Sequence, residues 1–190
     1  MLETTSFPQF CPDLTKDAYS LVPLRHQDIF KIKDWRNQQM DVLRQKKRLT
    51  DDGQERYYKD VVLPAFTEKE PNNLLYSYLK DGLCIGYGAL VHISWEDKRA
   101  EVSFLMNSEL AQNVNLYQEG FSVFLELLKM LAFKFLGLYK LYAETFDIRP
   151  LHVQVLELSG FQYEGRLKDH YYIQGNFVDT VFHSCFSNEK

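Results

Sequence analysis

Apolar and polar residues follow two different periods along the chain, and together they predict a mixed α/β protein. Residues 100–106, Ala-Glu-Val-Ser-Phe-Leu-Met, are bounded by polar segments and are typical of a strand. From Gly120 to Phe135 the run is too long and too apolar for a surface strand, so it predicts a largely buried helix. A turn that joins a strand to a helix beginning at glycine can bind phosphate, because free N–H groups meet the positive end of the helix dipole there.

The remaining segments extend this pattern in both directions. Strands are expected at residues 19–25, 74–79, 83–93, 138–146, 162–173 and 177–186, and helices after Asp28, Asp52 and Asp147. Asp81-Gly82 is a strong hairpin signal, so the strands around it form an antiparallel meander with residues 100–106. The strand at 138–146 follows a helical crossover and is therefore expected to run parallel to the strand at 100–106.

The length of 190 residues suits one domain with a sizeable core. Residues 1–18 carry two prolines and no periodicity, so they predict an N-terminal arm, and residues 19–190 form the domain. The expected fold class is α/β (α+β), with a mixed, mostly antiparallel sheet of about seven strands and helices on both faces.

Composition and charge limit the classes of partner. The net charge of −4 gives no global attraction to nucleic acid or to an anionic membrane, and Arg44 to Arg48 is the one basic cluster. No stretch approaches the length of a membrane span and the N-terminus lacks signal-peptide features, so a cytoplasmic location is expected. Cys11, Cys84 and Cys185 match neither a disulfide framework nor a zinc pattern, and no metal site is expected.

Several short motifs follow one another in a fixed order from about Leu21 to Phe186. The first are Leu24-Arg25 with Asp28, Trp35-Arg36-Asn37, Ile85-Gly86 and Ala100-Glu101-Val-Ser-Phe104. The final and most specific set comprises Ser159-Gly-Phe161, Glu164-Gly-Arg-Leu167, Tyr171-Tyr-Ile173, Gly175 and Val178-Asp179. In order and spacing these motifs resemble the GNAT acyltransferase superfamily, and within it the branch of ribosomal-protein alanine and nucleotide-amino-sugar N-acetyltransferases.

This resemblance implies both a fold and an acyl donor. GNAT enzymes transfer acyl groups from acetyl-CoA to amines, so acetyl-CoA is the expected acyl-donor substrate. The resemblance places the pantetheine arm along the central strand and the pyrophosphate at the turn that follows. The residues so implied are Ser103, Phe104, Leu105 and Met106 in the strand, and Glu119, Gly120, Phe121 and Ser122 in the turn.

The cofactor turn departs from the family pattern. That pattern is Arg or Gln, two residues, Gly, one residue, then Gly or Ala, because small residues let backbone amides close on a pyrophosphate. Here the best placement is Tyr117-Gln-Glu-Gly120-Phe-Ser122, which keeps one glycine but has Tyr117 in the leading position. Glu119 adds a negative charge beside the expected anion site.

Three residues are candidates for proton transfer. In the family a tyrosine acts as general acid toward the departing thiolate, and the resemblance places Leu156, which cannot donate a proton, at its position. Tyr117 is the tyrosine nearest to the expected thiolate and could replace it. Glu101 is the candidate base toward the amine, or else a strand residue that faces solvent or pairs with Arg99 or a neighbouring lysine. His92 alternates with Val91 and Ile93 and so is expected on the opposite side of the sheet, where it serves proton transfer or substrate binding, or is structural.

Two polar clusters have both a binding and a structural interpretation. Trp35, Arg36 and Asn37 could present an aromatic face, a cation and an amide to a sugar nucleotide, or could form a helix end packed on the core. The Arg44 to Arg48 cluster is interpreted as a solvated helix face, and the alternative is that it holds phosphates of the substrate.

The leading hypothesis is N-acetylation of an amine by acetyl-CoA, on a nucleotide-linked amino sugar or another small metabolite. One alternative is a GNAT-fold protein without catalysis that serves as a binding or scaffold subunit. The other is an acetyltransferase for peptide N-termini. The expected partner is a small-molecule amine, and the expected assembly is a monomer or a homodimer.

Overall fold

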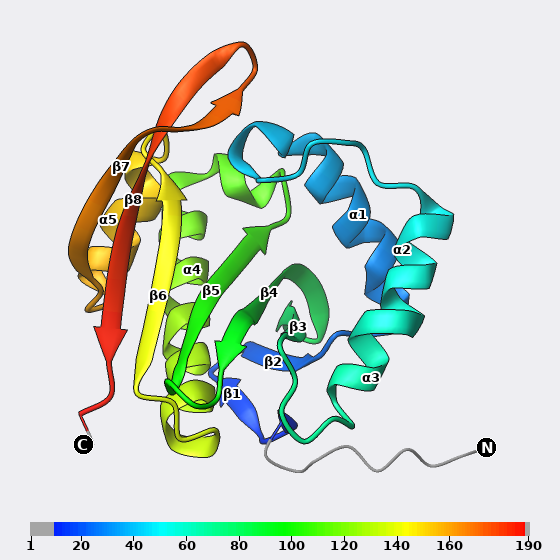
Figure 1. The fold of residues 1–190 in the computed structure, drawn as a ribbon. Helices are drawn as coiled ribbons and strands as arrows, with labels where there is room; N and C mark the ends of the chain where they lie inside the picture. The colour runs from blue at the N-terminus through cyan, green and yellow to red at the C-terminus, as the bar shows by residue number, and fades with distance from the viewer. Residues whose placement is uncertain (1–9, 189–190) are drawn as a thin grey trace.

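The computed structural model describes residues 10–188, which form one sheet with helices on both faces (Figure 1). Its strands are β1 (Leu14–Lys16), β2 (Tyr19–Pro23), β3 (Leu74–Lys80), β4 (Leu83–Ser94), β5 (Arg99–Met106), β6 (Lys140–Phe146), β7 (Gln162–Ile173) and β8 (Asn176–Phe186). The α-helices are α1 (Ile29–Gln38), α2 (Asp51–Tyr57), α3 (Leu63–Ala65), α4 (Val114–Lys129) and α5 (Pro150–Leu158). Short 3-10 helices are η2 (His26–Asp28), η3 (Met40–Val42) and η5 (Leu110–Gln112), and π-helical turns are η4 (Tyr58–Val62) and η6 (Met130–Phe135).

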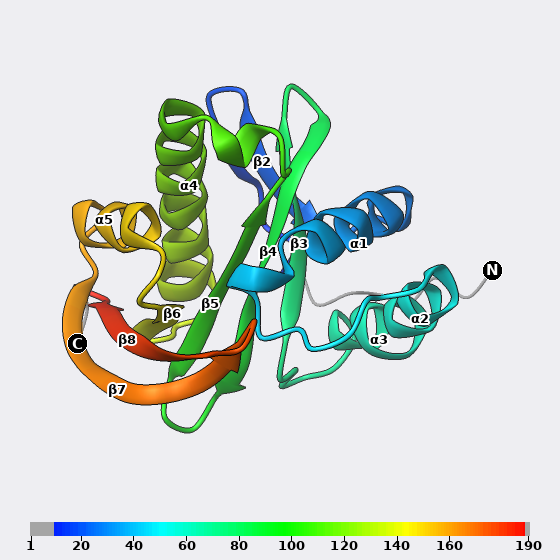
Figure 2. The ribbon, with the colours of Figure 1, turned by 90° about the horizontal axis from the view of Figure 1, so that it is seen from above.

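The sheet has the strand order β1-β2-β3-β4-β5-β6-β8-β7, so it holds eight strands within residues 10–188. Neighbouring strands are antiparallel except β5 and β6, which run parallel. In Figure 2, α4 and α5 cover one face of the sheet, and α1, α2 and α3 cover the other. The predicted mixed sheet with helices on both faces is confirmed.

The eighth strand comes from the segment that the sequence suggested was an arm. Leu14 in β1 pairs with Leu21 in β2, and the side chains of Leu14 and Phe10 are buried in the core. The apolar residues of this short segment explain its place at the sheet edge, since each has a core position to fill. Residues 1–9 of the predicted arm lie outside the described residues.

The central helix begins earlier than its apolar run predicts. The side chain of Asn113 caps α4 by accepting a hydrogen bond from the N–H of Leu116 at 3.1 Å, so the first helical residue is Val114. Gly120 therefore lies in the second turn, where its main chain belongs to the helix. The prediction that Gly120 opens the helix is wrong, because the polar N-cap residue, and not the glycine, determines where the helix starts.

The parallel strands β5 and β6 stay together over only three residue pairs. Arg99 to Glu101 pair with Lys140 to Tyr142, and beyond this point β5 continues beside β4 alone while β6 continues beside β8. The two strands therefore diverge and leave one backbone edge of β5 without a strand partner among the described residues. This divergence positions the site described below.

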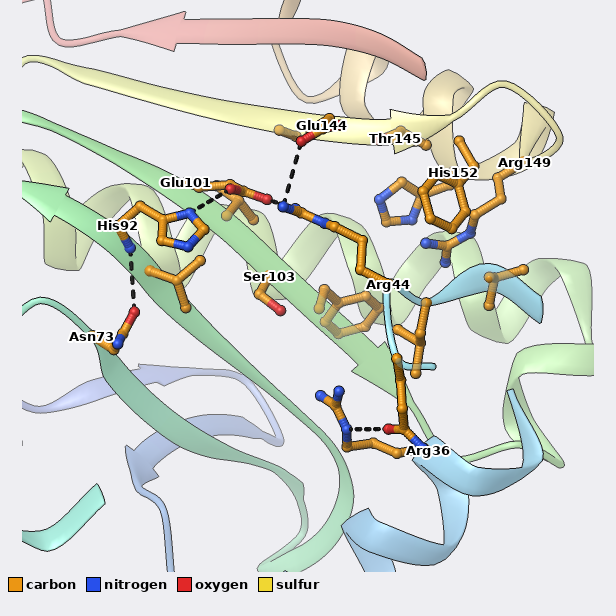
Figure 3. A pocket seen from close by; sticks show the side chains of 18 of the residues that line it. Arg36, Arg44, Asn73, His92, Glu101, Ser103, Glu144, Thr145, Arg149 and His152 are labelled. Carbon is orange, nitrogen blue, oxygen red and sulfur yellow. Dashed lines mark hydrogen bonds and ion pairs between the residues drawn. The ribbon is translucent and has the colours of Figure 1, made fainter. Parts of the chain in front are cut away.

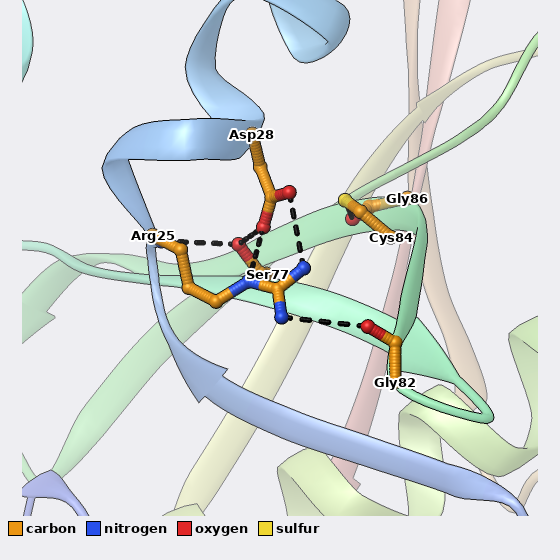
Figure 4. Close-up of polar contacts among 6 residues, drawn as sticks. All are labelled: Arg25, Asp28, Ser77, Gly82, Cys84 and Gly86. Atoms are coloured by element: carbon orange, nitrogen blue, oxygen red, sulfur yellow. Dashed lines mark hydrogen bonds and ion pairs between the residues drawn. The ribbon is translucent and has the colours of Figure 1, made fainter.

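The opening motif has a structural explanation (Figure 4). Asp28, which is 2% exposed, accepts hydrogen bonds from the Nε and Nη2 atoms of Arg25 at 2.6 and 3.0 Å and from the hydroxyl of Ser77 at 2.7 Å. This buried network ties the start of α1 to β3. Nearby, burial raises the pKa of the Cys84 thiol to about 12, which makes it an inert side chain. None of the helices within residues 10–188 is long and apolar enough to cross a bilayer.

Candidate active site

A pocket of about 460 Å³ opens where β5 and β6 diverge (Figure 3). Strands β4, β5 and β6, the start of α5, and the segment between α1 and α2 supply most of its lining. The predicted site residues that line it are Arg36, His92, Glu101, Ser103 and Phe104. The other predicted site residues lie outside its lining, namely Trp35, Asn37, Leu105, Met106, Tyr117, Glu119, Gly120, Phe121 and Ser122.

Glu101 is the buried carboxylate of the pocket, with 3% of its side chain exposed. Its Oε1 atom forms an ion pair with Arg44, and its Oε2 atom lies 2.8 Å from Nδ1 of His92. The structural interpretation in which Glu101 faces solvent or pairs with Arg99 or a neighbouring lysine is wrong, because Glu101 is buried against Arg44 and His92 while Arg99 pairs with Asp97 at 3.4 Å. Both oxygens of Glu101 therefore face nitrogen atoms that belong to other segments of the chain.

His92 reaches the pocket because β4 is irregular at this point. The pairing of β4 with β5 shifts register between Val91 and Ser94, and His92 has a positive φ of 51°. Val91 and His92 both line the pocket, so the expectation that they face opposite sides of the sheet is wrong. A β-bulge interrupts the strict alternation of a strand and turns a side chain toward a new direction.

The basic cluster that follows α1 does not form a helix. Residues 43–50 have no helical structure, and Arg44 pairs with Glu101 and, at 3.4 Å, with Glu144. Lys46 donates a hydrogen bond to the carbonyl oxygen of Tyr172 at 3.0 Å, near the end of β7. The interpretation of this cluster as a solvated helix face is therefore wrong, because its first members bind groups of the pocket and of the β7–β8 hairpin.

Tyr117 lies behind the pocket and is linked to it by two hydrogen bonds. Its hydroxyl is 2.7 Å from Nδ1 of His152 and accepts a hydrogen bond from Nη2 of Arg149 at 3.1 Å, and both partners line the pocket. Burial raises the pKa of Tyr117, and burial together with the charge of Arg149 holds the pKa of His152 well below its ordinary value. The hydroxyl of Tyr117 donates a hydrogen bond to Nδ1 of the neutral His152, so Tyr117 holds His152 in place.

The predicted cofactor turn is not a turn. The backbone N–H of Tyr117 already bonds to the carbonyl oxygen of Asn113 at 2.9 Å, so residues 119–122 have no free N–H groups for an anion. Among the described residues, the free donors of the first turn of α4 belong to Val114 and Asn115. Glu119 instead binds the hydroxyl of Tyr19 at 2.6 Å, which lowers the pKa of Glu119 and holds its charge away from the pocket.

Only the central residue of the Trp35-Arg36-Asn37 triplet reaches the pocket. Trp35 is buried in the core, and Asn37 exchanges hydrogen bonds with the backbone of Leu49 at 2.8 and 2.9 Å. Arg36 donates to Oε1 of Gln45 at 3.0 Å and to the hydroxyl of Tyr87. Trp35 and Asn37 therefore belong to a helix end packed on the core, whereas the guanidinium group of Arg36 lies at the pocket wall.

Glu144, Thr145 and His152 line the pocket but were not identified from the sequence, and Arg44 was identified only as a member of the basic cluster. Glu144 and Thr145 carry no local motif, His152 has no metal-ligand spacing, and Arg44 belongs to a basic run that is typical of a solvated surface. The side chain of Glu144 is only 10% exposed, and its Oε1 atom has no hydrogen-bond partner within residues 10–188.

Comparisons with known proteins identify the family and the fold. The sequence model of the family described as "Acetyltransferase (GNAT) domain" matches residues 21–182. A spermidine N-acetyltransferase from Vibrio cholerae in complex with CoA and spermine has the same fold, with a TM-score of 0.77, 20% identity, and coverage of 90% of this chain and 96% of that one. A probable acetyltransferase superposes with a TM-score of 0.73 and 18% identity over 95% of this chain and 98% of that one.

A chimera of the Vibrio cholerae enzyme SpeG with hSSAT gives a TM-score of 0.72 at 20% identity, over 90% of this chain and 96% of that chain. No curated protein sequence matches the chain significantly. At these identities the solved structures establish a shared fold, whereas the family match covers most of the sequence. The chain belongs to the GNAT acetyltransferase family.

Proposed function

We propose that this protein transfers the acetyl group of acetyl-CoA to the primary amine of a small molecule that also carries an anionic group. The observation that supports the proposal is the pocket at the divergence of β5 and β6, in which buried Glu101 contacts His92. Such a pocket combines an open backbone edge for the donor with titratable groups for the acceptor amine.

The residues around the divergence fit acetyl-CoA. Past Glu101, β5 has no strand partner on one side within residues 10–188, so its N–H and C=O groups there are available to the amides of a pantetheine arm. Ser103 and Phe104 line the pocket there, and the free N–H groups of Val114 and Asn115 suit a phosphate. Acetyl-CoA would supply the activated thioester carbon. Leu105 and Met106 would support the strand from the core, where both are buried.

The charges of the lining favour an acceptor with an anionic group. Three guanidinium groups and two carboxylates line the pocket, namely those of Arg36, Arg44, Arg149, Glu101 and Glu144. Arg44 pairs with both carboxylates, while Arg36 and Arg149 have no carboxylate partner among the described residues. A guanidinium without a carboxylate partner is suited to bind a carboxylate or a phosphate. A nucleotide-linked amino sugar has such phosphates, whereas the polyamine named for the Vibrio cholerae enzyme has none.

The test begins with calorimetric titration of acetyl-CoA and continues with an assay that detects the released CoA thiol. The acceptor panel holds a nucleotide-linked amino sugar, an amino acid, an alanine-terminated peptide and spermidine. We expect binding of acetyl-CoA and the highest turnover with an anionic amine. No binding at millimolar acetyl-CoA would refute the enzyme hypothesis, binding without turnover would favour a binding subunit, and a preference for spermidine would refute the acceptor class.

The contribution of Arg36 can be measured separately. Arg36→Gln removes a cation from the pocket, so we expect KM for the anionic amine to rise by about 10-fold, the equivalent of one charge-assisted hydrogen bond of about 1.5 kcal/mol. Arg48→Gln is the matched control, because Arg48 is an exposed arginine outside the pocket lining. Equal KM values in the two variants would show that Arg36 does not contact the acceptor.

A further inference from the structure

We propose that His92, rather than Glu101, accepts the proton of the acceptor amine. Glu101, itself paired with Arg44, orients the imidazole and compensates the charge that it gains. The proposal rests on the proposed function, because it names the proton acceptor of that same site. The three residues come from β4, β5 and the segment after α1, and they form a continuous chain of contacts along the pocket wall (Figure 3).

Glu101 is poorly placed to take the proton itself. It is 3% exposed, its Oε1 atom faces the guanidinium of Arg44, and its Oε2 atom faces Nδ1 of His92. Protonation of Glu101 would leave the charge of Arg44 without its buried partner, which is energetically costly. The contacts of Glu101 therefore suit a carboxylate that remains ionised and orients its neighbours.

His92 has the open nitrogen that Glu101 lacks. A carboxylate only accepts hydrogen bonds, so in the neutral imidazole Nδ1 carries the hydrogen atom that faces Glu101 and Nε2 keeps its lone pair. Nε2 makes no hydrogen bond within residues 10–188, 57% of the side chain is exposed, and His92 lines the pocket. An imidazole held through Nδ1 and open at Nε2 is the arrangement that general base catalysis requires.

The backbone holds His92 in an unusual conformation that aims it at the pocket. Its φ of 51° lies in the left-handed region, which is rare for residues other than glycine. The backbone N–H of His92 donates to Oδ1 of Asn73 at 3.2 Å, which satisfies a group that the register shift removes from the strand ladder. Strained conformations of this kind concentrate at functional sites.

The proton moves from the acceptor amine to His92 and from there to water. An acceptor that arrives as an ammonium ion loses one N–H bond, and a new N–H bond forms at Nε2 of His92. The amine nitrogen keeps the electron pair, which makes it a nucleophile, and the proton then passes from His92 to water. Glu101 on β5 is the charged group that contacts the His92 ring, and Arg44 pairs with Glu101 and with Glu144 on β6. Oε1 of Glu144 in turn lies 3.8 Å from Nε2 of His170 on β7.

The first experiment compares His92→Asn with the wild type. Asparagine tolerates a positive φ and can still bond to Glu101, but it cannot accept a proton. We expect kcat/KM to fall by about 10²- to 10⁴-fold, and the dependence of the wild-type rate on pH to flatten in the variant. His26→Gln is the matched control, since His26 is also exposed and bonded to a carboxylate, that of Glu55, but lies outside the pocket lining.

A second pair of measurements separates catalysis from folding. His92→Gly fits the backbone conformation, so added imidazole is expected to restore part of the lost rate. Independently of activity, nitrogen NMR of the histidine rings is expected to show the Nδ1–H tautomer of His92 in the wild type and a loss of that preference in Glu101→Gln.

The outcomes distinguish the inference from the proposed function. If the wild-type protein binds no acetyl-CoA, the proposed function is refuted. A wild type that turns over while His92→Asn keeps its rate and its pH profile would overturn the role of His92 alone. If His92→Asn loses activity but imidazole does not rescue His92→Gly and the tautomer is unchanged in Glu101→Gln, His92 has a structural role and the inference also fails.

Discussion

The effect of Gly120→Ala tests where the phosphates of the donor bind. A phosphate-binding glycine in a turn would not tolerate a side chain, because the ligand needs close approach to the backbone. In the structure, Gly120 lies inside α4, and an added Cβ would meet only the flexible end of the Met106 side chain. The structure and the turn predicted from the sequence therefore lead to opposite expectations for this variant.

The magnitude follows from two opposing terms. Alanine is about 1 kcal/mol more favourable than glycine inside a helix, and moving Met106 away from its present rotamer costs about 0.5–1.5 kcal/mol. We therefore expect a net change in the free energy of unfolding within about 1 kcal/mol, which corresponds to a Tm shift of no more than about 4 °C. The affinity for CoA is expected to stay within about threefold of the wild type.

Gly88→Ala is the matched comparison. A Cβ at Gly88 would overlap the ring of Phe124 and lie 2.7 Å from the carbonyl oxygen of Ser103, and neither the strand backbone nor a ring packed in the core can move aside easily. Overpacking of this kind costs about 1–3 kcal/mol or more, with no helical gain to offset it. Thermal unfolding measures both variants. A folded Gly120→Ala protein with a 10-fold or greater loss of CoA affinity, about 1.4 kcal/mol, would refute the placement of the phosphates at Val114 and Asn115.

Two further predictions concern buried ionisable groups. Asp28→Ala removes the buried partner of Arg25 and Ser77. Because Arg25 is 28% exposed and water can solvate it in part, we expect the free energy of unfolding in urea to fall by about 2–4 kcal/mol. A decrease below about 1 kcal/mol would contradict the role of this network. The pKa of His152 is held well below its ordinary value of 6.5 by burial and then by Arg149, so the unfolded chain binds a proton there that the folded chain does not. The contribution of His152 to stability is therefore present above about pH 6.5 and is lost as the pH falls below it. As the pH falls below about 6.5, the melting temperature is expected to decline less in His152→Gln than in the wild type. Parallel curves of melting temperature against pH for the two proteins would contradict this.

The family and most elements of the fold can be predicted from the sequence because their signals are local. The hairpin at Asp81-Gly82, the meander that includes β5, and the closing motifs of the last two strands each depend on residues close together in the chain. The family match over residues 21–182 agrees with the resemblance that these motifs carry. The narrower branch and its amino-sugar acceptor stay predictions, since no local pattern reports which groups meet in the pocket.

The sequence by itself determined the strand that carries Glu101, the long apolar helix beside it, and the family. Only the tertiary structure decided how the site is built. Arg44 meets Glu101 across 57 positions of the chain. His92 leaves the alternating pattern because of a bulge. Asn113, not Gly120, starts the helix. Periodicity reports which face of an element is buried, but long-range ion pairs, bulges and caps depend on how separate segments pack, and these place the groups that perform chemistry.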